Sequence, residues 1–300
     1  MLAIDFQYAS KEYRHRTGLE EARFSVEAGS FFGILGPSQS GKSTIVRLLF
    51  DYIHPTGGDV LVFEWNSVRD SVRIRQAAGY VPARVTGHSR MTVHDLLVFL
   101  CSSAGRVDEA RLRELCMKFH LEPRARFDAL EDGERKKLVF VSVLLRDPPL
   151  LVLDEPSLGL APFEREAVFA ELTRLHENGS TVLFTTRSVE EIVRYCTHAA
   201  ILQNGAVLRA GEVREMDFLR ARRVTFTADG ASEAAHALGI VNFQGDDRSV
   251  SFTYTGSIDT LVKTLAQFTV HTLRIEEPTM ESVLVANRVS EGGHPHEAEV

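Results

Sequence analysis

Gly36-Pro37-Ser38-Gln39-Ser40-Gly41-Lys42-Ser43-Thr44 matches the pattern G-x-x-x-x-G-K-[ST] at every fixed position. The apolar run 30–35 before it has the composition of a buried strand, and residues 44–50 after it carry apolar side chains at helical spacing. The glycines allow several backbone N–H groups to converge, and the following helix adds its positive end. We therefore predict a phosphate-binding loop between a strand and a helix.

The residue types within this loop predict how it would hold a nucleotide. We expect Lys42 to reach the β- and γ-phosphates and the hydroxyl of Ser43 to take one position on a Mg²⁺ ion. The predicted contacts to the phosphates come from Gly36, Pro37, Ser38, Gln39, Ser40, Gly41, Lys42, Ser43 and Thr44.

Composition describes an ordinary globular chain and argues against several functions. Of the 300 residues, 44% are hydrophobic and 25% are charged, which suits one large domain and a small one. The formal net charge of −7, with no basic stripe, argues against a nucleic-acid-binding surface. No apolar run approaches the roughly 18 residues that a membrane span requires, and residues 1–5 lack a secretory signal. We expect a cytoplasmic protein with three reduced cysteines, Cys101, Cys116 and Cys196.

Alternating strand and helix patterns predict an α/β core over residues 1–220. The run 150–154 is apolar and ends in a carboxylate, and 181–186 is a second buried strand after a helix over about 162–178. This order predicts a parallel, doubly wound sheet with helices on both faces, whose ligands bind at the carboxyl ends of the strands. Residues 2–35 read as a small antiparallel sheet leading into the first core strand, and about 84–145 read as a helical insert.

The pattern changes after about residue 220 and predicts a second domain. Residues 221–288 follow the order β-α-β-β-α-β, which is typical of a small ferredoxin-like α+β domain, with a last helix from 278 to about 287. Residues 289–300 are predicted to be a disordered tail.

Three segments together resemble the nucleotide-binding subunit of an ABC transporter. They are the loop 36–44, the run 150–155 and Leu130-Glu131-Asp132-Gly133-Glu134 between them. The resemblance extends over nearly the whole chain. The stretch 277–283, Glu-Pro-Thr-Met-Glu-Ser-Val, is similar to the end of the small domain in the branch that pairs with type-2 membrane exporters of drugs, lipids or polysaccharides.

The resemblance implies roles for further residues. Tyr13 would stack on adenine, Asp154 would help to hold Mg²⁺ through water, and Glu155 would be the catalytic base that polarises the attacking water. It also implies a head-to-tail dimer, in which each ATP lies between the phosphate loop of one subunit and the signature segment of the other. The surface around 84–104 would receive a helix from a membrane permease.

Five motifs depart from the family pattern. Gln39 replaces a glycine of the phosphate loop, and Ala83 replaces a glutamine. In the signature Leu-Ser-Gly-Gly-Gln, three residues are replaced by Glu131, Asp132 and Glu134. Ala161 replaces an aspartate, and Arg187 replaces the switch histidine. A left-handed backbone at Gln39 would cost about 1 kcal/mol or more. Ala83 has no side chain to contact a metal ion or water. Arg187 would anchor a γ-phosphate, but its guanidinium only donates hydrogen bonds and stays charged.

The acidic signature predicts repulsion of a triphosphate, which we expect Lys136 and Lys137 to offset in part. The departures together predict weak intrinsic hydrolysis. We therefore expect an ATP-binding subunit that drives or gates export, attached to the inner face of the membrane through its permease. A second nucleotide-binding subunit would complete it, as a homodimer or, as we favour, a heterodimer.

The alternative is a scaffold that binds ATP without hydrolysing it, although such a scaffold would not require Glu155. A soluble ABC protein of translation or DNA repair would need tandem nucleotide domains or a long coiled-coil insert, and the sequence contains neither.

Overall fold

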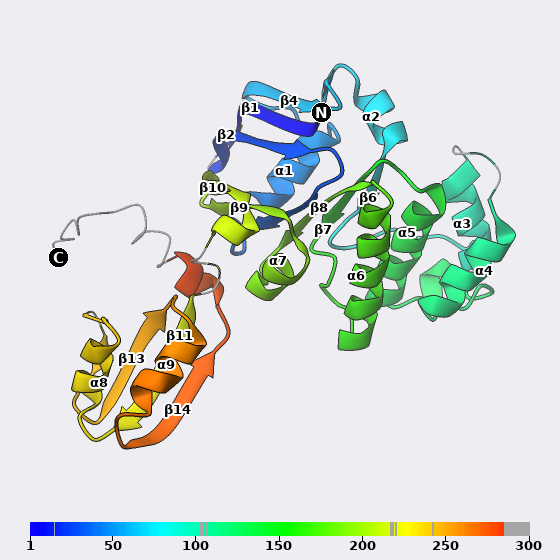
Figure 1. The fold of residues 1–300 in the computed structure, drawn as a ribbon. Helices are drawn as coiled ribbons and strands as arrows, with labels where there is room; N and C mark the ends of the chain where they lie inside the picture. The colour runs from blue at the N-terminus through cyan, green and yellow to red at the C-terminus, as the bar shows by residue number, and fades with distance from the viewer. Residues whose placement is uncertain are drawn as a thin grey trace. The chain divides into compact units, whose positions relative to one another are not determined.

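The computed structural model describes residues 1–14, 16–102, 105, 107–216, 219, 221–241 and 243–284 (Figure 1). The chain divides into two compact units. The first consists of Met1–Arg187 and Tyr195–Gly211, and the second of Ser188–Arg194 and Glu212–Val300. The predicted domain boundary at 220/221 therefore stays a prediction, since residues 188–194 and 212–220 group with the second unit. The tail predicted over 289–300 lies outside the described residues.

A six-stranded sheet forms the centre of the first unit. Its order is β10-β9-β3-β8-β7-β6, and the five strands from β9 to β6 in this order run parallel to one another. The strands are β3 (Phe31–Leu35), β6 (Ala78–Val81), β7 (Leu150–Asp154), β8 (Thr181–Thr186), β9 (His198–Gln203) and β10 (Ala206–Glu212). Every residue of β3, β7 and β8 is buried, as continuous apolar strands covered on both faces require.

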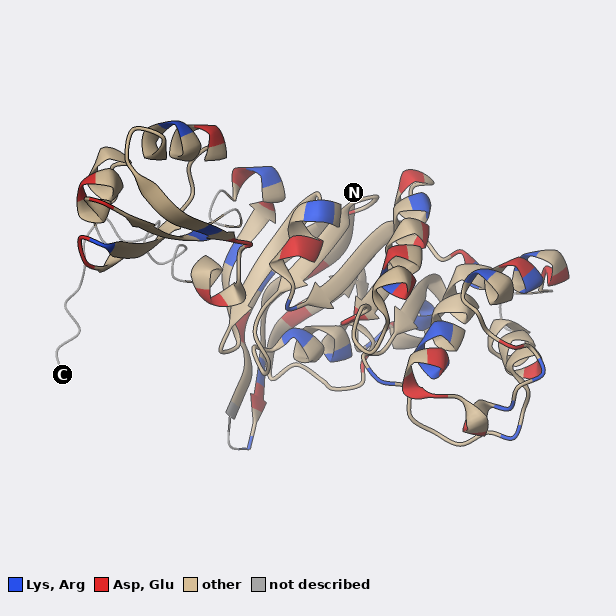
Figure 2. Ribbon diagram, turned by 90° about the horizontal axis from the view of Figure 1, so that it is seen from below, with Lys and Arg blue, Asp and Glu red and all other residues tan. Residues whose placement is uncertain are grey.

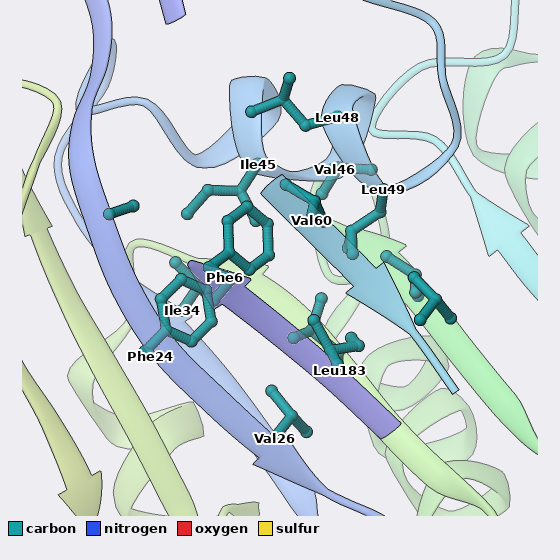
Figure 3. Packing of buried hydrophobic residues seen from close by; sticks show 14 of the residues in the cluster. Phe6, Phe24, Val26, Ile34, Ile45, Val46, Leu48, Leu49, Val60 and Leu183 are labelled. Atoms are coloured by element: carbon teal, nitrogen blue, oxygen red, sulfur yellow. The ribbon is translucent and has the colours of Figure 1, made fainter. Parts of the chain in front are cut away.

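One face of this sheet packs on α1 (Lys42–Leu49), which also contacts a second, antiparallel sheet. The second sheet has the order β2-β1-β4-β5 and consists of β1 (Leu2–Tyr13), β2 (Arg16–Glu27), β4 (Gly57–Val62) and β5 (Trp65–Asn66). Figure 3 shows the shared core, in which Phe6 and Phe24 stack with ring centroids 4.7 Å apart below Ile45 of α1. This core fixes the start of α1 against the ends of the parallel strands.

The other face of the parallel sheet is covered by α5 (Asp132–Arg146) and α6 (Pro162–Glu177). The ring of Phe184 contacts that of Phe169 on α6, with centroids 5.5 Å apart. A Cβ at Gly79 would lie 2.3 Å from Val143 of α5, so the helix can approach β6 only over a glycine. The predicted α/β core, with helices on both faces of a parallel sheet, is confirmed. Two short helices lie between its strands in sequence, α2 (Ser71–Ala77) directly before β6 and α7 (Val189–Tyr195) between β8 and β9.

The helical insert contains α3 (Val93–Cys101), α4 (Glu109–Lys118) and the 3₁₀ turn η2 (Phe127–Ala129) before α5. Thr92 caps α3, because its Oγ1 accepts a 3.1 Å hydrogen bond from Asp95 N. Glu171 of α6 is 3% exposed and forms ion pairs with Arg111 and Lys118 of α4. These pairs fasten the insert to the core.

In the second unit, the sheet order is β12-β13-β11-β14 with all pairs antiparallel. Its elements are η3 (Val213–Glu215), β11 (Arg222–Ala228), α8 (Ala231–Ala237), β12 (Gln244–Gly245), β13 (Ser249–Tyr254), α9 (Ile258–Leu265) and β14 (Val270–Glu276). Phe226 and Leu261 are fully buried between sheet and helices. Residues 280–284 are helical, within the helix expected from 278.

Charged side chains are spread over several helices of the first unit (Figure 2). Helices α1 and α2 carry only basic ones, and α4, α5 and α6 carry both signs. Within the described residues, no helix is both long and apolar enough to cross a bilayer.

His94 should make the stability of the insert depend on pH. Hydrogen bonds to Asp95 and then Glu109 raise its pKa above the ordinary 6.5. Because the folded-state pKa is raised, the stabilisation is complete below about pH 6.5 and is lost as the pH rises through the folded-state value. We expect His94→Gln to lower the melting temperature more at about pH 5.5 than at about pH 8.5. Equal losses at both values would contradict this.

Candidate functional site

The predicted phosphate loop lies between the end of β3 and the start of α1. Gly36 N donates to Thr186 O at 3.2 Å, and a Cβ at Gly36 would lie 2.4 Å from Ser40 Oγ. Gly41 has φ 108°, a conformation that favours glycine. Gln39 has φ 65°, so the left-handed backbone considered from the sequence is present, at a cost of about 1 kcal/mol or more. The backbone here thus takes the strained curl that the motif predicts.

The side chain of Lys42 closes the loop from within. It is 5% exposed, and its Nζ donates to Gly36 O at 2.7 Å and to Pro37 O at 2.8 Å. Burial lowers the pKa of Lys42, and the nearby carboxylates of Glu155 and Asp154 oppose that shift. The ammonium group therefore lies inside the curl of the loop and beside two carboxylates.

Asp154 stands at the carboxyl end of β7 and is 6% exposed. Its Oδ2 accepts a 2.9 Å hydrogen bond from Ser43 Oγ, and its Oδ1 accepts a 2.6 Å hydrogen bond from Thr185 Oγ1. The hydroxyl and carboxylate oxygens are the hard donors that Mg²⁺ prefers. Ser43 and Asp154 therefore fit a Mg²⁺ ion next to the phosphates.

Glu155, the next residue, is held by two cations. Its Oε1 lies 3.6 Å from Lys42 Nζ, and its Oε2 lies 3.2 Å from Arg187 Nε. Arg187 Nη1 also donates to Ser38 Oγ at 3.3 Å. The structure thus joins the catalytic candidate, the switch position and the phosphate loop in one chain of polar contacts.

Tyr13 ends β1 next to the loop. Its hydroxyl lies 3.5 Å from Thr44 Oγ1, and its ring fills the space above Gly18, where a Cβ would come within 2.3 Å of it. Ala83 follows β6 in a bend and presents no polar side chain. All the residues predicted for nucleotide contact by one subunit therefore gather at one edge of the parallel sheet.

The acidic signature segment lies at a separate place, the start of α5. Glu131 and Asp132 are exposed, and Glu134 Oε2 accepts a 3.0 Å hydrogen bond from Glu131 N. The expectation that Lys136 and Lys137 offset these charges is wrong. Both lysines are buried and bind elsewhere: Lys136 to the carbonyls of residues 155 and 158, and Lys137 to Glu164.

The sequence analysis missed one participant, Thr185, and gave another, Lys136, the wrong partners. Thr185 binds Asp154, and it could have been found, because it ends a predicted parallel strand and so shares an edge with the end of β7. The contacts of Lys136 could not have been found from the sequence, because its partners are backbone carbonyls whose position depends on tertiary packing.

A glycine-rich loop and strand-end carboxylates on a parallel sheet define a P-loop nucleotide-binding protein. A family model described as "ABC transporter" matches residues 19–158. The chain is 35% identical over 216 residues to Nod factor export ATP-binding protein I of Bradyrhizobium sp. (strain SNU001), covering 70% of each chain. The protein of the same name from Rhizobium etli is 32% identical over 221 residues, covering 72% of this chain and 70% of that one. The chain belongs to the ABC transporter family as an ATP-binding subunit.

Solved structures share the fold. An ATP-binding subunit of an ABC transporter aligns with a TM-score of 0.65 at 21% identity, covering 88% of this chain and 99% of that one. An ATP-binding cassette solved as a dimer in a post-hydrolysis state with ADP and Pi aligns with a TM-score of 0.63 at 22% identity, covering 70% and 99%.

Proposed function

We propose that this chain binds MgATP at a dimer interface to drive or gate export through a separate membrane permease, and that its own hydrolysis is weak. The observation that carries the proposal is the state of Glu155. The carboxylate is retained at the end of β7, yet each of its oxygens faces a cation, Lys42 or Arg187.

The geometry supports a division of roles within the site. The loop amides of 36–44 and the ammonium of Lys42 would bind the phosphates, and Tyr13 would stack on adenine. Ser43 and Asp154 would hold Mg²⁺, which neutralises charge on the phosphates when bound. Glu155 would accept hydrogen bonds from the attacking water, since positioning dominates phosphoryl transfer. Arg187 would contact the terminal phosphate.

Three features support slow turnover. Ala83 offers no amide to hold the water or the metal ion. Arg187 donates and cannot accept, so a water molecule that it contacts is not oriented toward the phosphate as a histidine could orient it. In addition, Glu155 must exchange its contacts with Arg187 and Lys42 before it can bind water.

The signature segment supports pairing with a different subunit. In a head-to-tail dimer, the carboxylates of Glu131, Asp132 and Glu134 would face the ATP bound by the partner. A pair of like charges about 4 Å apart repels by on the order of 4 kcal/mol near a protein surface. Lys136 and Lys137 donate to other groups, the carbonyl oxygen of Leu158 and the carboxylate of Glu164. In a heterodimer, one nucleotide site can still close. It is the site between the phosphate loop of this chain and a complete signature segment of the partner.

The permease would attach at the helical insert. Phe99 is 64% exposed on α3, the adjacent Leu100 is 38% exposed, and Met91, which precedes α3, is 36% exposed. Apolar side chains grouped in this way favour contact with another protein. We propose that the complex belongs to the type-2 exporter branch, and the relatives named for Nod factor export support a role in export. Attachment through the permease would place the chain on the inner face of the membrane.

A non-hydrolysing ATP-binding scaffold is the second candidate, and the double pairing of Glu155 favours it. Binding at a hundredfold excess over Kd supplies about 2.7 kcal/mol, which is enough to shift a conformational equilibrium without any hydrolysis.

The first test measures ATP binding and turnover of the purified chain. We expect calorimetry with Mg²⁺ to show binding that Lys42→Ala abolishes, and phosphate release below about 1 s⁻¹, the low end for enzymes. Glu155→Gln should bind ATP and lose this release, and Arg187→His should increase it. No release from the wild type would favour the scaffold, and release faster than about 10 s⁻¹ would contradict weak hydrolysis.

Restoring the signature tests the acidic segment. The triple change Glu131→Ser, Asp132→Gly and Glu134→Gln should raise turnover of the dimer about tenfold, because the repulsion at the partner's ATP is removed. Glu177→Gln, which removes an exposed charge at the end of α6, is the control. An unchanged rate in the triple variant would count against this account.

Phe99→Asp tests the docking surface. It should leave the melting temperature within about 2 °C, because exposed substitutions cost little, and should abolish copurification with the permease. Phe163→Asp alters a side chain of equal exposure, 63%, on α6 and should copurify normally. Normal copurification of Phe99→Asp would exclude this face.

A further inference from the structure

Lys136 reaches from the signature helix to the turn that carries Glu155. Its side chain is 4% exposed on α5, and its Nζ donates to the backbone carbonyl oxygens of Glu155 and, at 3.0 Å, of Leu158. An ammonium group this deeply buried costs free energy unless its protons are bonded. The two carbonyl oxygens accept the hydrogen bonds that the buried ammonium group needs and that an apolar side chain would not make.

The turn that Lys136 holds is strained. Glu155 has φ 46°, the left-handed region, which costs an L-residue about 1–2 kcal/mol. It also precedes Pro156, and a proline disfavours helical backbone in the residue before it. Such a conformation persists only where its surroundings fix it.

Contacts on both sides of Glu155 fix this backbone. On the amide side, Glu155 N donates to Thr185 O at 3.1 Å and to Thr185 Oγ1 at 3.0 Å. On the carbonyl side, Glu155 O accepts from Leu158 N at 3.1 Å and from Lys136. Lys136 supplies the one charged donor among these contacts. Charge-assisted hydrogen bonds are roughly twice as strong as neutral ones.

Neighbouring contacts bring the start of α5 close to the same loop. A Cβ at Gly133 would lie 3.0 Å from Gly159 O, so any side chain at this position would be crowded by the loop. Lys137, next to Lys136 and 5% exposed, pairs with Glu164 at 2.6 Å at the start of α6. The two lysines therefore hold different parts of the loop, Lys136 the Glu155 turn and Lys137 the helix after it.

We propose that Lys136 is a positioning residue for hydrolysis, which holds the backbone of Glu155 so that its carboxylate points at the nucleotide. The acceptors of Lys136 are the backbone carbonyl oxygens of Glu155 and Leu158. Its role rests on the proposed function of Glu155, but the geometry that it fixes exists whether or not ATP is hydrolysed.

The experiment compares Lys136→Met, Lys136→Arg and the matched Lys137→Met in the full chain. Hydrogen exchange of the backbone amides reports the stability of the turn, and calorimetry with MgATP and steady-state phosphate release report binding and turnover. In Lys136→Met, the amides of Leu158 and Leu160 should exchange about tenfold faster, since a bond to a charged donor is lost. Amides of β3 and β9 should be unchanged.

Turnover should fall about tenfold in Lys136→Met with ATP affinity within about twofold, because chemistry and not binding depends on the Glu155 turn. Lys136→Arg should restore much of the rate. Lys137→Met should accelerate exchange at the start of α6 and leave Leu158 as in the wild type. If Lys136→Met does not fold, Lys136→Gln replaces it, with a smaller acceleration of about threefold expected from a neutral donor.

Wild-type exchange at Leu158 in Lys136→Met, or an equal acceleration in Lys137→Met, would overturn the role of Lys136. Weaker ATP binding with unchanged turnover would overturn it as well. Absence of phosphate release from the wild type, with the exchange results as expected, would contradict the proposed hydrolysis and still support Lys136 as the residue that fixes this turn.

Discussion

The carboxylate of Asp154 joins the three parts of the chain on which the site depends. Through Ser43 it ties the end of β7 to the start of α1, and through Thr185 it ties β7 to the end of β8. Both hydroxyls donate to a group that is 6% exposed, where unmade hydrogen bonds would be costly. The phosphate loop, the metal-binding candidates and Glu155 are therefore positioned by one buried carboxylate and by the sheet beneath it.

The departures from the family pattern act together through charge. Arg187 brings a permanent cation to the edge where Lys42 already lies, and both contact Glu155. At the start of α5, Glu131 and Asp132 are exposed, and the nearby Lys137 pairs with Glu164 of α6. The two half-sites of the subunit thus differ in charge. This difference is the physical argument behind the unequal nucleotide sites that we propose.

Sequence reasoning located the core because its signals are local. The loop 36–44, the apolar strand 150–154 and the helices that follow them can each be recognised from the pattern of residues within one continuous stretch of sequence. The pairing of Arg187 with Glu155 was not predicted, because their side chains meet only after β7 and β8 align. Lys136 and Lys137 were assigned to the wrong partners for the same reason. Their distance from the acids along the helix was known, but the position of the loop 155–164 was not.

The lysine of the phosphate loop affects the affinity of the site for a nucleotide. Because Lys42 bonds to the carbonyls of Gly36 and Pro37, the protein's own side chain maintains the curvature of the backbone there. Because the loop is already ordered, little of the binding free energy of an anion is spent on the conformational entropy of ordering it. Affinity should then depend mainly on charge, on desolvation and on the exchange of the Lys42 hydrogen bonds to these carbonyls for bonds to the phosphates.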